Sequence, residues 1–209
     1  SSWTNLNELF VGTFGGGLLG ITDQGSVSST AGFIGRNAGS NGAVTVTGPG
    51  SAWTSSSTIY VGNAGSGTLT VTDGGSVAAS QITTPAVAGR TGILNTGSDA
   101  GQAATAAGTL DTSGIAFGAG AGSLIFNHTD ADYDFDVAIT GAGTIQQVAG
   151  VTRLTADNSG FTGSTAISGG TLLVNSTLGD AASEVVVLGG GTLGGNGTIG
   201  GNVTVGGGA

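Results

Sequence analysis

The sequence predicts an all-β chain folded as a right-handed parallel β-helix, a solenoid of roughly nine coils with three short strands in each coil. The first observation behind this prediction is a repeat: Trp3 and Trp53, and likewise Val11 and Val61, lie 50 positions apart. A weaker copy at half the period aligns Ile34 between Val11 and Val61, in steps of 23 and 27 residues. Steps of this size suit one coil of a solenoid.

The second observation is a strand period inside each repeat, where apolar residues alternate with small or polar ones. In the second repeat the apolar positions are Ile59, Val61, Leu69, Val71 and Val77. The third observation is that NAGSG and DGG divide these runs, and glycine supplies the positive φ angles of tight turns. Each repeat therefore reads as short strands joined by turns, with Leu69 expected to stack on its counterparts in the neighbouring coils.

Other repeat architectures fit less well. Leucine-rich repeats and helical arrays need leucine spacings or amphipathic helices that the sequence lacks, and propeller blades need about 40 residues with four strands. The alternative that stays open at this point is an antiparallel β-sandwich.

The whole chain, 1–209, is expected to be a single β-helix segment of a longer protein, because the repeat is already under way at Ser2 and the pattern is unfinished at Ala209. Three parts differ in regularity: two clear 50-residue repeats in 1–79, irregular coils with an outward loop in 81–112, and further strand repeats in 114–209. A helix over 102–107 would have no apolar stripe, so a loop is favoured there.

Composition narrows the classes of partner. The chain has 45 glycines, no cysteine, no lysine, three arginines and a net charge of −9. Nucleic acid is not expected as a partner, because phosphate recognition needs clustered cations. The sequence has neither an apolar run of membrane-spanning length nor a basic leader with an apolar core, so no membrane insertion by this segment is expected. Nothing in the pattern indicates a cofactor or a thiolate metal site.

Three stretches resemble a known family. The run SLIFNHTDADYDFDVAITGAGTIQQVAGVTRLTADNSGFTGSTAISGGTLLVN is similar to the strand repeats in passenger domains of Gram-negative type V autotransporters. GGTLGGNGTIGGNVTV is similar to the segment leading into the pertactin-like region of those passengers, and the front repeats resemble repeats of large proteins in the same group. The resemblance implies a passenger exported across the outer membrane to the cell surface or the medium. It also gives the absence of cysteine a reason, since a disulfide formed in the periplasm would obstruct export.

The function expected from fold and resemblance is adhesion, aggregation or host interaction by a rigid, non-catalytic display rod. Its partners would be a surface receptor or a glycan on a host or neighbouring cell, and self-association is also expected. A structural stalk and a carbohydrate-active β-helix enzyme are the alternatives. Catalysis is not expected, because the chain offers one histidine, three scattered arginines, no G-x-S-x-G elbow and no phosphate-binding loop.

Three single residues stand out as candidates. Trp3 and Trp53, each followed by threonine, can present flat faces to a sugar or a receptor, although packing on equivalent coil corners is favoured. His128 is expected at the surface as a hydrogen-bonding residue, since no second histidine or cysteine accompanies it as a metal ligand.

The densest charge in the chain is a row of four aspartates: Asp130, Asp132, Asp134 and Asp136. In a strand their alternation with Ala131, Tyr133 and Phe135 places all four carboxylates on one face. Calcium binding is one hypothesis, but carboxylates about 7 Å apart along one strand cannot alone surround the ion. A solvated acidic face, with Tyr133 and Phe135 packed inside, is the favoured interpretation.

Overall fold

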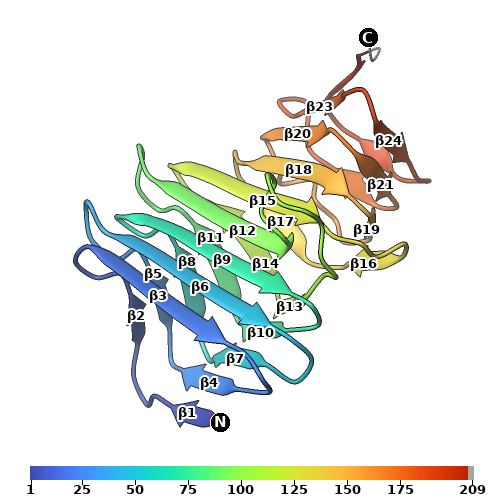
Figure 1. The fold of residues 1–209 in the computed structure, drawn as a ribbon. Coiled ribbons are helices and arrows are strands. Elements are labelled where there is room, and N and C mark those ends of the chain that lie inside the picture. Colours follow the sequence, from blue (N-terminus) through green and yellow to red (C-terminus); the bar gives the residue numbers. More distant parts are fainter. Residues whose placement is uncertain (207–209) are drawn as a thin grey trace.

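The computed structural model describes residues 1–206, which contain 26 β-strands and no helix. Every pairing between two of these strands is parallel. The strands stack into the coils of a parallel β-helix, with the two termini at opposite ends (Figure 1). The predicted fold is therefore confirmed, and the β-sandwich alternative is wrong.

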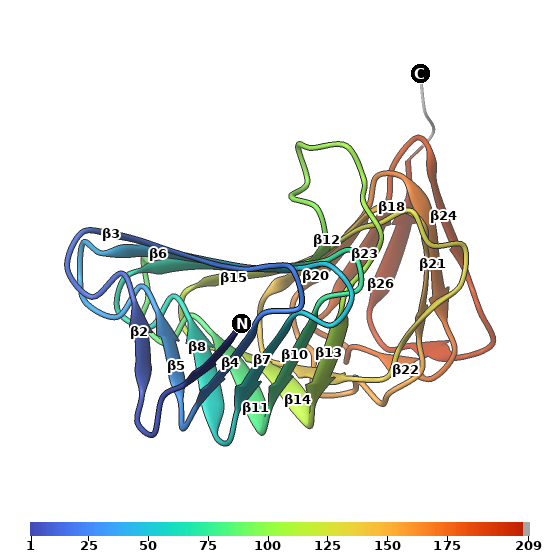
Figure 2. The same ribbon diagram turned by 60° about the horizontal axis from the view of Figure 1, so that its bottom comes forward.

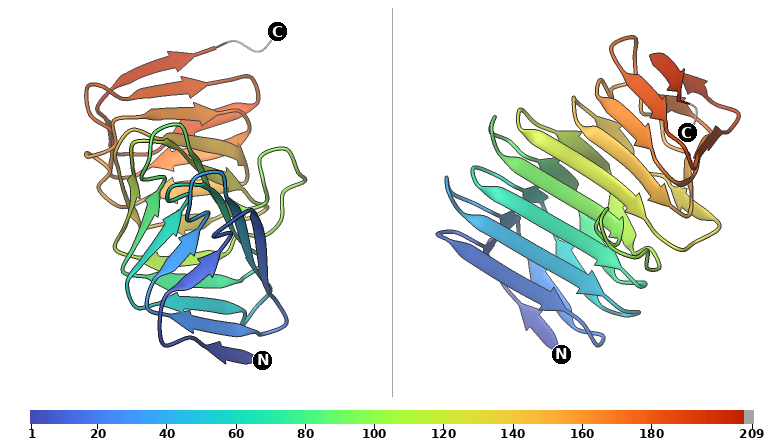
Figure 3. Two further views of the ribbon diagram at one scale, coloured as in Figure 1. Left: turned by 90° about the vertical axis from the view of Figure 1, so that its left-hand side faces the viewer. Right: turned by 45° about the horizontal axis from the view of Figure 1, so that its top comes forward.

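One side of the β-helix is a nine-stranded sheet, here called the long sheet, that runs the length of the molecule (Figures 1 and 3). Eight turns of the chain connect its first and last strands, close to the coil number predicted. In stacking order its strands are β3 (Gly16–Ile21), β6 (Asn41–Thr47), β9 (Ser66–Thr72), β12 (Thr91–Gly97), β15 (Ala121–Asn127), β18 (Thr144–Ala149), β20 (Ser164–Ile167), β23 (Glu184–Val187) and β26 (Asn202–Val205).

The strand that opens each coil belongs to a second side, which is divided into two sheets. The first sheet has five strands: β1 (Ser2–Thr4), β4 (Ser26–Ser29), β7 (Ala52–Ser55), β10 (Ser76–Ala79) and β13 (Thr109–Thr112). The other has four: β16 (Tyr133–Phe135), β19 (Val151–Leu154), β21 (Gly170–Val174) and β24 (Gly191–Gly194). No ladder joins β13 to β16.

The third side is divided one coil later. Its six-stranded sheet contains β2 (Leu9–Val11), β5 (Gly32–Ile34), β8 (Thr58–Val61), β11 (Gln81–Thr84), β14 (Gly114–Phe117) and β17 (Ala138–Thr140). A two-stranded sheet of β22 (Thr177–Leu178) and β25 (Thr198–Ile199) follows. Only the long sheet is therefore continuous from the first coil to the last.

The register confirms how the sequence repeat maps onto coils. Val11 pairs with Ile34 and Ile34 with Val61, so one 50-residue repeat makes two coils. In the long sheet Leu69 lies between Val44 and Leu94, and all three side chains are buried. The strand period thus places one apolar side chain per coil in each inward stack, which each new coil covers.

Glycine recurs at Gly12 and Gly62 because the chain turns there beside the next coil. Both residues have positive φ, 75° and 80°. A Cβ on Gly12 would lie 2.4 Å from the carbonyl oxygen of Asn41, and one on Gly62 would lie 2.5 Å from that of Thr91. The conformation and the close approach both require glycine at this corner of the coil.

The stretch from 81 to 112 contains β11, β12 and then a connection over residues 98–108 before β13 begins. This connection has no helical turn over 102–107 and projects from the body of the β-helix, as Figure 2 shows. Within residues 1–206 no helix is long and apolar enough to cross a membrane. The predicted continuation beyond Ala209 concerns an end of the chain outside the described residues.

Candidate functional site

The connection over residues 98–108, here called the outer loop, folds over the outward face of the long sheet. Asn95, Ile125 and Asn127 alternate with inward residues on β12 and β15, yet each is at most 5% exposed. Ile125 is buried without belonging to the apolar interior of the coils. The base of the loop therefore covers a small patch of the outer face, while its tip extends into solvent.

Two buried asparagines hold the first half of the outer loop. Asn127 Nδ2 donates to the carbonyl oxygens of Asp99 and Gln102, at 2.7 and 3.0 Å. Asn95 Nδ2 donates to Thr70 Oγ1 at 3.0 Å and also contacts the Asp99 carboxylate. These bonds give protein donors to loop carbonyls that would otherwise lose their hydrogen bonds to water on folding. The exposed tip, residues 99–103, is thus carried on a fixed base.

The second half of the outer loop is held from two directions. The hydroxyl of Thr72 lies 2.5 Å from that of Thr105 and donates to the carbonyl of Ala106 at 3.1 Å. On the other side, the Ala107 N–H donates to Asp130 Oδ2 at 2.7 Å, and the Tyr133 hydroxyl donates to the Gly108 carbonyl at 2.9 Å. Burial, followed by the charges of Asp130 and Asp136, raises the pKa of Tyr133, so its phenol remains a donor.

His128 is fully buried beside this anchor, and the prediction of a surface residue is wrong. Its Nε2 lies 2.8 Å from Thr152 Oγ1, and its Nδ1 lies 3.6 Å from Asp130 Oδ2. Burial lowers the pKa of His128, while the carboxylate of Asp130 and the backbone of the same residue act in the raising direction. Since Leu124, Phe126 and His128 are two positions apart, the alternation of β15 continued by one residue places the imidazole inside.

The aspartate row does not form one continuous strand face, which corrects the prediction. Only residues 133–135 are in strand β16, and Asp130 turns toward the outer loop. Asp132 and Asp134 both contact the guanidinium of Arg153, which β19 brings opposite Asp134. Asp136 is exposed.

The apolar partners of this row lie as predicted. Phe135 is buried in the core and Tyr133 is partly buried against it. Sequence reasoning missed Arg153, because only the register between coils brings it beside the aspartate row. No spacing within the local sequence indicates this contact. Among residues 1–206 no group of three or more His, Cys, Asp or Glu side chains is placed to hold a metal ion.

The two tryptophans occupy equivalent places two coils apart, and they differ in exposure. Trp53 is fully buried; its ring meets Gly32, where a Cβ would lie 2.4 Å from the indole, and its Nε1 donates to Ser29 Oγ at 3.2 Å. Trp53 therefore offers no face for stacking on a ligand. Trp3, in the first coil, is 49% exposed.

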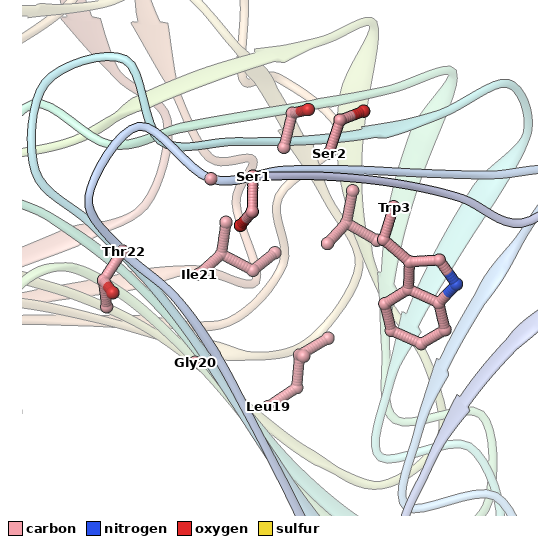
Figure 4. A pocket seen from close by; sticks show the side chains of 10 residues that line it. Ser1, Ser2, Trp3, Leu19, Gly20, Ile21 and Thr22 are labelled. Carbon is pink, nitrogen blue, oxygen red and sulfur yellow. The ribbon is translucent and has the colours of Figure 1, made fainter.

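Trp3 lies at a hollow in the N-terminal end of the β-helix, seen in Figure 4 with Leu19, Ile21 and the side chains of Ser1 and Ser2. Val27 of the next coil also lines this hollow. The strand of Trp3, β1, has a neighbouring strand on one side only, whereas the strand of Trp53, β7, is paired on both sides. The hollow is therefore the open interior of the first coil.

An aromatic ladder crosses the outer face of β2, β5 and β8, and sequence reasoning missed it. Phe10 and Phe33 have ring centroids 5.3 Å apart, and Phe33 stacks on Tyr60 at 4.8 Å. The Arg36 guanidinium lies 4.1 Å from the Phe10 centroid. Pairing of Phe10 with Phe33 and of Phe33 with Tyr60 in register explains the ladder.

Comparisons with known proteins show that the chain is similar to parts of longer bacterial proteins. It is 38% identical, over 97 residues and 46% of its length, to the adhesin BmaC autotransporter of Brucella suis. It is 36% identical, over 92% of its length, to a protein described as the uncharacterized lipoprotein YdeK of Escherichia coli. The chain is thus homologous in part to an autotransporter adhesin and to a lipoprotein.

A third relative, YuaQ of Escherichia coli, is 40% identical over 60 residues. The chain spans 3%, 16% and 4% of the lengths of BmaC, YdeK and YuaQ. No family model matches the chain, and no solved structure matches it significantly. The β-helix itself is of a kind that suits a passenger segment.

Proposed function

We propose that this chain is a segment of an exported passenger at the cell surface, where it acts in adhesion as a rigid display rod. The observation that supports the proposal most directly is the 38% identity to an autotransporter adhesin over 97 residues. A β-helix suits this role, because continuous ladders between coils keep the rod stiff while loops at its corners carry variable residues.

The outer loop is the element that we propose as the contact region. Its tip is exposed, whereas its base is fixed by Asn95 and Asn127, so little ordering entropy is lost on binding. The partner we propose is a receptor or a glycan on a host or neighbouring cell. The three arginines and the net charge of −9 argue against nucleic acid as the ligand.

A structural stalk in the cell envelope is the second candidate. It is favoured by the 36% identity to a lipoprotein across 92% of the chain, a match that covers coils along most of the rod. In that case the binding region would belong to another part of a longer protein.

We also propose that the segment is not catalytic. The one histidine of the chain is fully buried and engaged with Thr152. Glycoside hydrolysis needs two carboxyl groups that face each other across a cleft. Asp132 and Asp134 instead both face Arg153.

The test is adherence of beads that carry the purified chain to cultured cells and to a glycan array. A matched variant replaces residues 100–103 by a Gly/Ser segment of equal length and keeps Asp99, Asn95 and Asn127. Adherence that the loop variant loses would support the display rod. Absence of adherence in both proteins would support the structural stalk. Turnover of an acidic polysaccharide by the unmodified chain would overturn the non-catalytic assignment.

A further inference from the structure

The segment from His128 to Tyr133 lies where the ladder between β13 and β16 is missing, and it holds the second half of the outer loop. Asp130 accepts from Ala107 and Tyr133 donates to Gly108. In addition, the Thr129 N–H donates to the Thr105 carbonyl at 2.9 Å. Thr105 and His128 also form an isolated parallel bridge. Hydrogen bonds that involve Thr129, Asp130 and Tyr133 therefore take the place of a strand ladder at this point.

His128 is the group in this anchor that can change charge near neutral pH. Its Nδ1 is buried without a hydrogen-bond partner, and its ring lies 5.0 Å from that of Tyr133. On another side Gly150 packs directly on the imidazole, where a Cβ would lie 2.3 Å from Nδ1. The ring has no room to turn toward water while the segment stays closed.

The charges that face His128 are few. Its own segment supplies the Asp130 carboxylate, and β16 supplies the Tyr133 phenol, which is neutral. From β19 it meets the neutral Thr152, while the adjacent Arg153 turns outward to Asp132 and Asp134. In the described part of the chain, Asp130 is thus the single charged group recorded against the ring, and its Oδ2 already accepts from Ala107.

We propose that His128 and Asp130 form an acid-sensitive latch that holds the outer loop closed at neutral pH and releases its second half when His128 takes up a proton.

The physical reason is the cost of a buried charge. Burial lowers the pKa of His128 in the closed segment, and the one carboxylate at 3.6 Å offsets this only in part. In the open segment the imidazole reaches water and titrates near its ordinary pKa of about 6.5. Below that pH the open form binds a proton that the closed form does not, so acid shifts the equilibrium toward opening.

Amide hydrogen exchange measured at pH 7.5 and pH 5.0, corrected for the intrinsic exchange rate, tests the latch. The amides of Ala107 and Thr129 should exchange up to about 30-fold more readily at pH 5.0, the ratio set by an open-state pKa of about 6.5. The amide of Val44, in the long sheet and away from the outer loop, should keep its protection. Because the chain has one histidine, its imidazole signals report the titration directly by NMR.

Two variants separate the latch from general acid sensitivity. His128→Gln keeps a polar side chain near Thr152 and removes the titration, so protection of Ala107 and Thr129 should no longer depend on pH. Asp130→Asn keeps an oxygen to accept the Ala107 N–H and removes the charge that favours imidazolium, so the acid response should increase. Circular dichroism at both pH values checks that each variant retains the strand signal.

Three results would overturn the latch. One is unchanged or greater protection of Ala107 at pH 5.0 in the unmodified chain, which would mean that Asp130 fully compensates the imidazolium. Another is the same loss of protection in His128→Gln. The last is an equal loss at Val44, which would mean that acid opens the whole β-helix.

Discussion

At the scale of single residues, Trp3 and Trp53 show that equivalent positions in a repeat need not contribute equally to stability. Both lie on the strand that opens a coil, but only Trp53 has coils on both sides. Trp53→Ala should lower the free energy of unfolding by about 3–5 kcal/mol, because it empties a fully enclosed site. Trp3→Ala should cost about 1 kcal/mol or less, since the ring is half exposed.

Urea unfolding followed by circular dichroism measures both values, and Trp3→Ala serves as the matched control. Equal losses in the two variants would contradict the assignment of Trp53 to the core and Trp3 to an open end.

The region around His128 shows what local alternation can predict and where it stops. The alternation that places Leu124 and Phe126 inside also places His128 inside, and that signal was available in the sequence. The inward parity then changes: Tyr133 and Phe135 are inward at odd positions after Phe126 and His128 at even ones. The change falls in residues 129–132, which belong to no strand, and no local pattern determines where such an interruption reverses the faces.

At the scale of elements, the aspartate row behaves as an ion-paired edge. Asp132 and Asp134 are 68% and 67% exposed and share Arg153, while Asp130 is committed to the Ala107 N–H. Calcium should therefore bind no more tightly than about millimolar at physiological salt, because too few oxygens converge for six to eight ligands.

Isothermal calorimetry with calcium checks this prediction, with Asp132→Asn/Asp134→Asn as the control variant. Micromolar binding that the double variant loses would restore the calcium hypothesis.

Coil length explains what the sequence predicted well and what it missed. In the first coils Val11, Ile34 and Val61 keep nearly even spacing, and the predicted stacking of Leu69 is correct. Later, the step from Val77 to Leu110 is lengthened by the outer loop, while Asp134 and Arg153 are only 19 positions apart. Contacts across coils of unequal length, such as that of Arg153, cannot be located without the register.

At the scale of the whole molecule, the N-terminal end of the isolated chain 1–209 should promote association. Large apolar side chains are exposed in the first coil: Trp3, Leu6, Phe10, Phe14 and Leu18. The edges of β1, β2 and β3 are unpaired on that side, and unpaired edges with apolar neighbours attract further strands. Sedimentation velocity should therefore show concentration-dependent association of the purified chain.

The double substitution Phe14→Lys/Leu18→Lys, on side chains that are 85% and 89% exposed, should reduce this association without unfolding the coils. A strict monomer at high concentration, for which repulsion between chains of charge −9 would be responsible, would contradict the prediction.

The missing ladder between β13 and β16 also has a mechanical consequence. The hydrogen bonds between coils run along the axis of the rod, so a force that pulls its two ends apart loads them directly. Between the coils of β7 and β10 three ladders share such a load, but only two ladders remain at each of the three levels from the coil of β13 to that of β21. A stretched molecule should first separate within this stretch of coils, into two shorter rods that each keep their own stacked interior.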